Sequence, residues 1–440
     1  MKPEPAVFGS AVRVGSGQIT LMNLVGACLL SFLAAGGEQT AVTPASPEKI
    51  NEAIVFTVPS LPAKRSYQRI VLASVEEARR LGLSPKELTL VKVRGAAQPR
   101  PMQWDERTKE PYFLQPAQAA GESTEVTLIK AESYQAEVNV EHAYMQDQLW
   151  MTTLADGAQR RLFAFQHDEI LPPGIKPVYR RAGFIHPVLT PSGQVISGSF
   201  APDHAHHHGI WTAWSHTDFQ GRHPDFWNVH QETGRVDYEG LGPRWIGPVD
   251  SGFTATLRSI DTGTKPPTVV LTEGWRVTTY VPGPGTPETV FELETTQRNV
   301  TADPLTLTKH IYGGLGFRGL PTWTVDAPLT FVTSEGQLGR KAGDGQRARW
   351  FAFAGPTAQG RGGIAILAHP ANVNFPQWTR FNPKDPFVAF TPVHDGPITL
   401  KPDEVLTQRF RFVVFDGEPD VARLEDCWQG FAHPTRAVAK

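Results

Sequence analysis

Apolar residues recur at every second position over many short segments of this 440-residue chain. The alternation is clearest in residues 254–257, 268–272, 275–280, 289–294 and 410–415. Successive side chains of an extended strand point to opposite faces, so this pattern predicts strands with one buried face. Runs of Pro and Gly, such as residues 282–285, supply the turns between them. The chain is therefore expected to fold mainly as antiparallel sheet.

The rest of the pattern favours one large sandwich over a helical or repeating architecture. Residues 75–81 have the apolar spacing of a short helix, and no fixed-period repeat indicates a propeller or solenoid. The 40 Gly, 38 Pro, 24 Phe and 11 Trp are typical of many short strands, whose aromatic residues mostly fill the core and also suit stacking on sugar rings. We expect a mainly β fold, a large antiparallel β-sandwich with a small N-terminal β module.

Composition divides the chain into segments. The apolar run from Ile19 to Ala35 follows Lys2 and Arg13 and ends in small residues, which predicts a signal peptide rather than a spanning helix. Export places the mature protein in the periplasm or outside the cell. The expected segments are residues 1–37 as signal peptide, 38–50 as flexible leader, 51–131 as the small β-rich module and 132–440 as the large domain that carries the site.

The two cysteines bear on anchoring and on disulfides. Residues 25–28 resemble a lipoprotein acylation box, so a lipid anchor at Cys28 is the alternative to cleavage of the signal. The apolar run continues past Cys28, which favours cleavage. Removal of Cys28 leaves Cys427 as the only thiol, and no intrachain disulfide can then form.

Charge and motifs exclude several classes of function. The formal net charge is -2 and no long run of one sign is present, so neither nucleic acid nor an anionic membrane is an expected partner. No P-loop, dinucleotide fingerprint, G-x-S-x-G elbow or paired C-x-x-C occurs. A small molecule or an oligosaccharide is the expected ligand.

A histidine-rich segment is the strongest candidate for a site. His204, His206, His207 and His208 follow Asp203 and directly precede an apolar strand. An extended backbone would place His204, His206 and His208 on one face, where three imidazoles could bind one divalent transition metal. Without metal, a row of imidazoles that titrate near neutrality can transfer protons to and from a polar substrate. A solvated histidine-rich loop is the plain alternative.

Other polar and aromatic positions complete the candidate set. Glu273, Lys309, Arg318 and His369 interrupt otherwise apolar strands, so they are candidate acid/base or oxygen-binding groups. Paired structural charges are the alternative for each of them. The candidate substrate-binding residues are Trp211, Asp225, Trp227, His230 and Asn372.

The segments around residues 203–211, 225–227, 309, 318 and 369–372 together resemble a bacterial family of unknown function labelled "methane oxygenase PmoA". The resemblance covers residues 135–420, and one departure is His208, where the family pattern usually has Arg. The label fits poorly, because a methane monooxygenase subunit needs several spanning helices and this chain has one apolar run. The resemblance implies a galactose-mutarotase-type supersandwich, a fold shared by aldose epimerases, polysaccharide lyases and several glycoside hydrolases.

Three functions follow as hypotheses. The first is an exported carbohydrate-active enzyme, a lyase, hydrolase or epimerase that works through the histidine-rich site. The second is a non-catalytic protein that binds a glycan or a metal in the same place. The third is a metal-dependent oxygenase, as the family label says.

Overall fold

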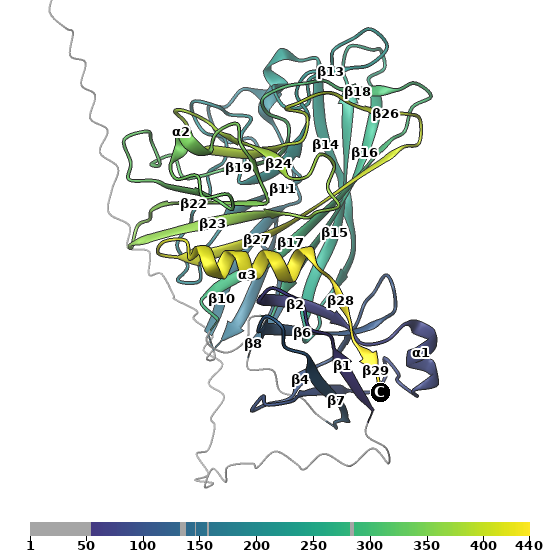
Figure 1. Cartoon of the computed structure of the whole chain (residues 1–440). Coiled ribbons are helices and arrows are strands. Elements are labelled where there is room, and N and C mark those ends of the chain that lie inside the picture. Colours follow the sequence, from purple (N-terminus) through teal and green to yellow (C-terminus); the bar gives the residue numbers. More distant parts are fainter. Residues whose placement is uncertain (1–53, 133–137, 146, 156–157, 282–285) are drawn as a thin grey trace, which may run out of the picture. The chain divides into compact units, whose positions relative to one another are not determined.

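The computed structural model describes residues 54–132, 138–145, 147–155, 158–281 and 286–440. Within these ranges the chain is mainly antiparallel sheet (Figure 1), which confirms the predicted β-sandwich. The predicted signal peptide, the leader and Cys28 lie outside the described residues. None of the helices in the described ranges is long and apolar enough to cross a membrane.

The N-terminal module consists of two small sheets around one apolar core. A five-stranded sheet has the order β29-β1-β7-β3-β4, and a four-stranded sheet has the order β28-β2-β6-β5. Phe56, Ile70, Phe113 and Val126 meet between them and are fully buried. The strands are β1 (Val55–Val58), β2 (Arg65–Val71), β3 (Thr89–Val93), β4 (Arg100–Pro101), β5 (Gln103–Trp104), β6 (Pro111–Gln118), β7 (Thr124–Lys130), β28 (Thr435–Arg436) and β29 (Val438–Ala439).

The module contains the predicted helix and also two strands from far along the chain. Helix α1 spans Val75–Arg80, and the Ser74 hydroxyl caps it by accepting a hydrogen bond from the Glu77 amide. Strand β28 pairs with β2 in parallel and β29 pairs with β1 in antiparallel fashion. Residues 435–439, which sequence analysis placed with the large domain, therefore complete both sheets of the module.

The large domain is a sandwich of two extended sheets. One has nine strands in the order β21-β24-β25-β19-β12-β11-β10-β9-β8, and the other has eight in the order β14-β15-β16-β17-β27-β23-β22-β20. The first sheet contains β8 (Val138–Met145), β9 (Gln148–Ala155), β10 (Ala158–Gln166), β11 (Phe184–Val188), β12 (Ile210–Ala213), β19 (Gly314–Arg318), β21 (Arg347–Ala348), β24 (Gln377–Phe381) and β25 (Phe387–Thr391). The second contains β14 (Gly234–Trp245), β15 (Asp250–Asp261), β16 (Thr268–Tyr280), β17 (Glu288–Asn299), β20 (Thr330–Thr333), β22 (Trp350–Pro356), β23 (Arg361–Ala368) and β27 (Val405–Asp416).

The alternation seen in the sequence sorts side chains between the two faces of the eight-stranded sheet. On β27, Phe410, Phe412 and Val414 point into the core between the sheets. Arg411 and Val413 point to the opposite face, which helix α3 (Val421–Ala432) covers (Figure 1). Arg411 is buried there and its guanidinium binds the Glu292 carboxylate at 2.6 Å, so this buried charge is paired.

The large domain also contains shorter elements, among which the three-stranded sheet β13-β18-β26 lies at one end of the sandwich (Figure 1). They are β13 (Thr217–Asp218), β18 (Leu305–Leu307), β26 (Ile398–Leu400), the helix α2 (Arg340–Gly343) and the 3₁₀ turns η1 (Pro177–Tyr179) and η2 (Val229–Gln231). Loops that join packed strands can vary without disturbing the core, so this end is where a site is expected.

The start of β12 requires a glycine. A Cβ atom on Gly209 would lie 2.2 Å from the backbone oxygen of Ile185 on β11. We expect Gly209→Ala to lower the free energy of unfolding by about 1–3 kcal/mol, because backbone must move to relieve the clash. Chemical denaturation measures the change. Gly240→Ala is the matched control, since nothing lies within 4 Å of its added Cβ, and an equal effect of both variants would contradict the expectation.

Candidate active site

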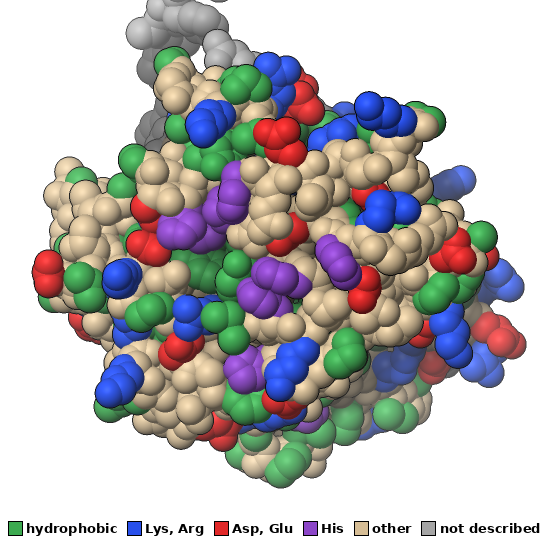
Figure 2. All heavy atoms as spheres, turned by 90° about the horizontal axis from the view of Figure 1, so that it is seen from above, with side chains coloured by type: hydrophobic (Ala, Val, Ile, Leu, Met, Phe, Trp, Pro, Cys, Tyr) green, Lys and Arg blue, Asp and Glu red, His purple; other side chains and the backbone are tan. Residues whose placement is uncertain are grey.

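The histidine-rich segment forms a loop that is fastened to β19 at both ends. The Gly198 amide donates to the Arg318 carbonyl at 2.9 Å, and the Arg318 amide donates to the Gly209 carbonyl at 2.8 Å. Arg318 ends β19, which pairs with β12 through Ile210 and Phe317. Histidine side chains gather around the middle of the face seen in Figure 2. The loop is thus held by strands of the nine-stranded sheet.

The loop is folded back on itself, so the predicted extended backbone is wrong. The His204 amide donates to the Ala201 carbonyl, and the His207 amide donates to the His204 carbonyl at 2.9 Å. The Phe200 amide closes the loop by donating to the His207 carbonyl at 3.0 Å. These two consecutive turns remove the alternation of side chains on which the one-face arrangement depended.

Three of the four histidines meet, and the fourth points elsewhere. The rings of His204 and His207 stack in parallel with centroids 4.6 Å apart, and His206 lies edge-on to both. His208 is buried in another direction, where it stacks on Phe184 at 4.3 Å and its Nδ1 lies 3.0 Å from the Ser199 hydroxyl. The site is therefore built around His204, His206 and His207.

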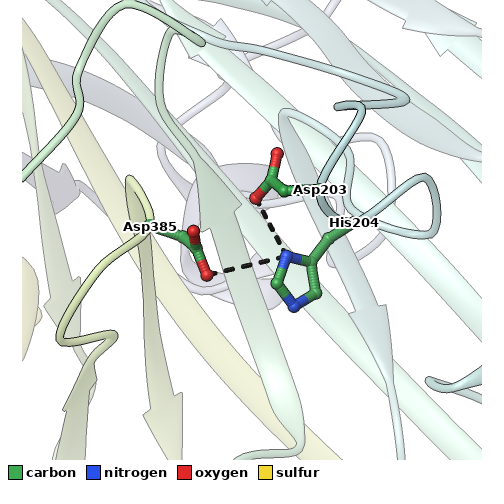
Figure 3. Close-up of side chains that lie close together, drawn as sticks. All are labelled: Asp203, His204 and Asp385. Atoms are coloured by element: carbon green, nitrogen blue, oxygen red, sulfur yellow. Dashed lines mark hydrogen bonds and ion pairs between the residues drawn. The ribbon is translucent and has the colours of Figure 1, made fainter.

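An Asp–His pair is the central feature of the site (Figure 3), and an arginine binds the carboxylate of that pair. His204 Nδ1 lies 2.9 Å from an Asp203 carboxylate oxygen and 3.6 Å from Asp385 Oδ2. The second ring nitrogen, Nε2, points away from both carboxylates (Figure 3). Arg318, which is 2% exposed, donates to both Asp203 oxygens at 2.7 Å, and its other terminal nitrogen lies 3.3 Å from His207 Nδ1.

These contacts determine the charge state of the carboxylate. Partial burial of Asp203 acts to raise its pKa, but hydrogen bonds from His204 and Arg318 outweigh it and lower the pKa to about 2. Asp203 is therefore ionised at neutral pH. An ionised carboxylate accepts the Nδ1 proton of His204, which leaves Nε2 as the nitrogen that can accept a proton from a bound molecule.

The other rings differ from the expected near-neutral titration. Burial, with the nearby His204 and His230, lowers the pKa of His206 to about 3. Burial also lowers the pKa values of His207 and His208 well below the usual range. All three rings are neutral at pH 7, so they serve as hydrogen-bonding groups rather than as cations.

Two cavities open beside these histidines. The smaller has a volume of about 80 Å³ and is lined by His204, His206, His207, Trp227, Asn228, Tyr312, Arg380, Asn382 and Phe387. The larger has a volume of about 820 Å³ and is lined in part by Tyr179, Arg181, His206, His208 and Asp237. His206 lines both cavities, so its side chain is common to their walls.

Aromatic side chains form the floor below the histidines. The Trp211 ring lies 5.2 Å from His207 and 4.9 Å from Trp227, and Phe387 packs against all three. Trp211 is fully buried and Trp227 is 2% exposed, so of the two only Trp227 reaches the cavity wall. Their main effect is to exclude water and hold the histidines in position.

Asp225 acts by positioning its neighbours. It is 2% exposed and accepts hydrogen bonds from the Trp227 amide at 2.9 Å and from the Asn228 amide at 2.6 Å. Its second oxygen accepts from the Asn228 side chain, which lies 3.2 Å from the Tyr312 hydroxyl. His230 is exposed and lies 5.6 Å from His206, at the edge of the site.

The remaining predicted residues lie away from the small cavity. Glu273 is buried between the sheets, where burial raises its pKa and it accepts hydrogen bonds from Thr212 and Trp275. Lys309 is exposed in the loop after β18. His369 packs on Phe431 of α3, and Asn372 binds the Arg409 backbone. These contacts give each buried residue a structural partner.

Several residues of the site were not found from the sequence. Asn382 and Asp385 lie in the link between β24 and β25, and Phe387 is the first residue of β25. The Asn382 side chain holds the link by accepting from the amides of Lys384 and Asp385. Arg380 lies near the end of β24 and pairs with Asp344 at 2.6 Å. The signal available in the sequence is residues 382–386, a polar and proline-rich interruption between two apolar strands.

Two carboxylates and one imidazole lie close enough together to be considered as ligands of the predicted metal. In the described part of the chain, the group whose ligand atoms lie within 4.8 Å of one another is Asp203, His204 and Asp385, and it lacks His206 and His208. Both oxygens of Asp203 already accept hydrogen bonds from Arg318. A cation at this point would lie beside the positive charge of the buried guanidinium, so the group suits proton transfer better than metal binding.

The fold and site define a large β-sandwich protein with an Asp–His–Arg constellation at its loop end, in which Arg318 is buried and the side chains of Asp203 and His204 are 37% and 35% exposed. A model for the family of unknown function DUF6807 matches residues 152–429, which is more than half of the chain. The chain belongs to this family. The match contains the whole of the candidate site.

Comparisons with other proteins add little on activity. None of the curated proteins compared with the chain matches it. Among solved structures, an α-galactosidase from Lactobacillus brevis is similar at 10% identity, over 63% of this chain and 39% of that chain, with a TM-score of 0.28. The likeness spans less than half of that chain, and at this TM-score it carries no argument about fold or activity.

The neutral histidines predict acid lability. A buried imidazole whose folded pKa is lowered contributes stability above the unfolded pKa near 6.5, and that stability is lost as pH falls toward the folded value. For His206, with a folded pKa of about 3, the loss between pH 7 and pH 5 is about 2 kcal/mol. We expect His206→Gln to lose correspondingly less free energy of unfolding than the wild type over this interval. Urea titrations at both pH values measure it, with the exposed His223→Gln as control; parallel losses in all three proteins would refute the assignment.

Proposed function

We propose that this protein is an enzyme that acts on a saccharide or sugar derivative by general acid/base catalysis, with His204 as the group that exchanges the proton. The observation that carries the proposal is the Asp203 carboxylate, which binds both His204 Nδ1 and the buried Arg318. A carboxylate so placed fixes the tautomer of the imidazole and stabilises its cationic form after it has taken a proton.

The residues around His204 have distinct supporting roles. Asp385 lies 3.6 Å from His204 Nδ1 and adds a second negative charge beside the protonated ring. Neutral His206 and His207 line the same cavity, together with the Tyr312 hydroxyl and the Asn228 amide. These groups both donate and accept hydrogen bonds, which suits the hydroxyl and carbonyl oxygens of a sugar.

The geometry favours reactions that begin with proton removal. Both oxygens of Asp203 are engaged by Arg318 and His204, so this carboxylate is a poor nucleophile. A hydrolase of the usual kind needs two carboxyl groups that flank the scissile bond, whereas elimination and epimerisation need a base at a C–H bond. A lyase or epimerase is therefore the better match within the carbohydrate-active class, and hydrolysis is the weaker one.

The proposal also includes export from the cytoplasm and a resemblance to sugar-processing folds. The apolar run from Ile19 to Ala35 supports export to the periplasm or beyond. The resemblance to the "methane oxygenase PmoA" group and to mutarotase-type supersandwiches supports sugar chemistry only through analogy between folds.

A metal-dependent reaction, such as that of an oxygenase, is the second candidate. The observation in its favour is the convergence of one imidazole and two carboxylates at Asp203, His204 and Asp385. A non-catalytic binding protein would use the same cavities and show no turnover. The two experiments below separate these alternatives from acid/base catalysis.

His204→Asn tests the proton-transfer role. We expect it to lower kcat about 10²- to 10⁴-fold and to change substrate affinity less than about tenfold, because the ring is needed for the chemical step more than for binding. The assay is release of unsaturated or epimerised product from a panel of oligosaccharides and glycosides, followed by mass spectrometry and NMR. His223→Asn, an exposed histidine outside both cavities, is the control. Wild-type turnover that survives His204→Asn would overturn the assignment.

Elemental analysis tests the metal alternative. The protein is purified without a His tag and incubated in turn with Zn, Cu, Ni and Fe. We expect it to retain far less than one ion per chain after desalting, because the Arg318 guanidinium binds both oxygens of the Asp203 carboxylate. Retention of about one ion per chain, lost in Asp385→Ala, would instead make Asp203, His204 and Asp385 a metal site and redirect the assays to metal-assisted chemistry.

A further inference from the structure

We infer that one ligand occupies both cavities at once, and that it is an uncharged oligosaccharide that places a small group of its terminal unit in the small cavity while its following units lie in the large one. The inference rests on the proposed function and names the substrate class of that site. It is carried by His206, by the charges of the large cavity and by the difference in volume between the two cavities.

His206 is a buried polar group that lacks a partner. The residue is 8% exposed, and no hydrogen bond reaches its ring from the part of the chain that the structure describes. The rings around it, Tyr179, His204, His207 and His230, contact it through their faces and edges. The ring nitrogens of His206 reach the cavity space and carry no hydrogen bond within the described residues, so they are available to bond a ligand there.

The lining of the large cavity is balanced in charge. Its guanidinium groups belong to Arg180, Arg181 and Arg235, and its carboxylates belong to Glu169, Glu232 and Asp237. Arg235 Nε donates to Asp237 Oδ1 at 2.8 Å, and Arg181 donates inward to the Thr212 carbonyl at 3.0 Å. Three charges of each sign give the lining no net charge that would favour an anion or a cation, while their oxygens and nitrogens suit a ligand with many hydroxyl groups.

Apolar surface interrupts these polar groups. Pro177, Val178, Tyr179, Val229 and Val236 also line the large cavity. The half-buried Tyr179 ring lies 6.3 Å from the His206 ring and 21° from parallel to it. An aromatic side chain of the large cavity therefore stands next to the histidine that both cavities share. A sugar ring presents hydroxyl edges and C–H faces, and this mixture of paired charges and an aromatic ring matches both.

The two cavity volumes indicate which part of the ligand lies in which cavity. At about 30 Å³ for each water in the liquid, the small cavity of about 80 Å³ has room for about three waters, or for one small group of a sugar. The large cavity of about 820 Å³ is the size of pockets that hold whole organic ligands. The reacting end of the ligand therefore lies at His204 and its longer part lies beyond His206, so the protein acts on chain ends.

Length dependence of binding tests the inference. Isothermal titration calorimetry of the full chain would use mono-, di- and trisaccharides of glucose, galactose, mannose and xylose, with galacturonic acid oligomers as the charged comparison. We expect at least one neutral series in which the trisaccharide binds at least tenfold more tightly than the monosaccharide. Tyr179→Ala should remove that advantage and change monosaccharide affinity less than twofold. The exposed His223→Ala should leave every affinity unchanged.

Three results would overturn the inference: no binding by any neutral series, no dependence on length, or tighter binding of the uronic acid oligomers. This inference and the proposed function can fail independently of each other. Length-dependent binding lost in Tyr179→Ala, with turnover unaffected in His204→Asn, would keep the binding mode and refute the acid/base role. Turnover lost in His204→Asn, with equal affinity for every length, would do the reverse.

Discussion

The buried guanidinium of Arg318 is the constraint on which the candidate site depends. A charge at 2% exposure is costly to bury unless it is paired or hydrogen-bonded, and the Asp203 carboxylate supplies a counter-charge at 2.7 Å. To bring Asp203 there, the loop must turn back on itself after Gly198 and return at Gly209. His204 then follows Asp203 into place, and His207 lies against the same guanidinium. One ion pair thus determines the shape of the loop and the orientation of two histidines.

Much of the fold could be predicted because its causes are local. Alternating apolar residues identified the strands β15, β16, β17 and β27, since burial of one face of a strand leaves its mark at every second position. The helix at Val75–Arg80 was likewise found, with its end off by one residue. The pairing of residues 435–439 with β1 and β2 was not predicted, because strands that are distant in sequence leave no periodic pattern that shows their pairing.

The sequence draws attention to the loop of the candidate site, but it does not give the geometry of that loop. Four histidines before a buried strand mark the loop in the sequence, whereas the turns at Ala201 and His204 depend on an arginine more than a hundred residues away. Asp385 was missed for the same reason, since only the folded sheet brings it to His204. Glu273 shows the opposite difficulty: a carboxylate in a strand pattern signals either chemistry or a buried hydrogen-bond network, and Thr212 and Trp275 make it the second.

The contribution of β28 and β29 to the N-terminal module has a consequence for how the protein is made. Residues 55–130 leave the ribosome early, yet each of their sheets lacks one strand until residues 435–439 have been synthesised. Until then the outer edges of β1 and β2 expose unpaired backbone groups, which other strands can join. The folding of the module therefore has to wait for the end of the large domain, because a segment that emerges early is among the last to reach its final structure.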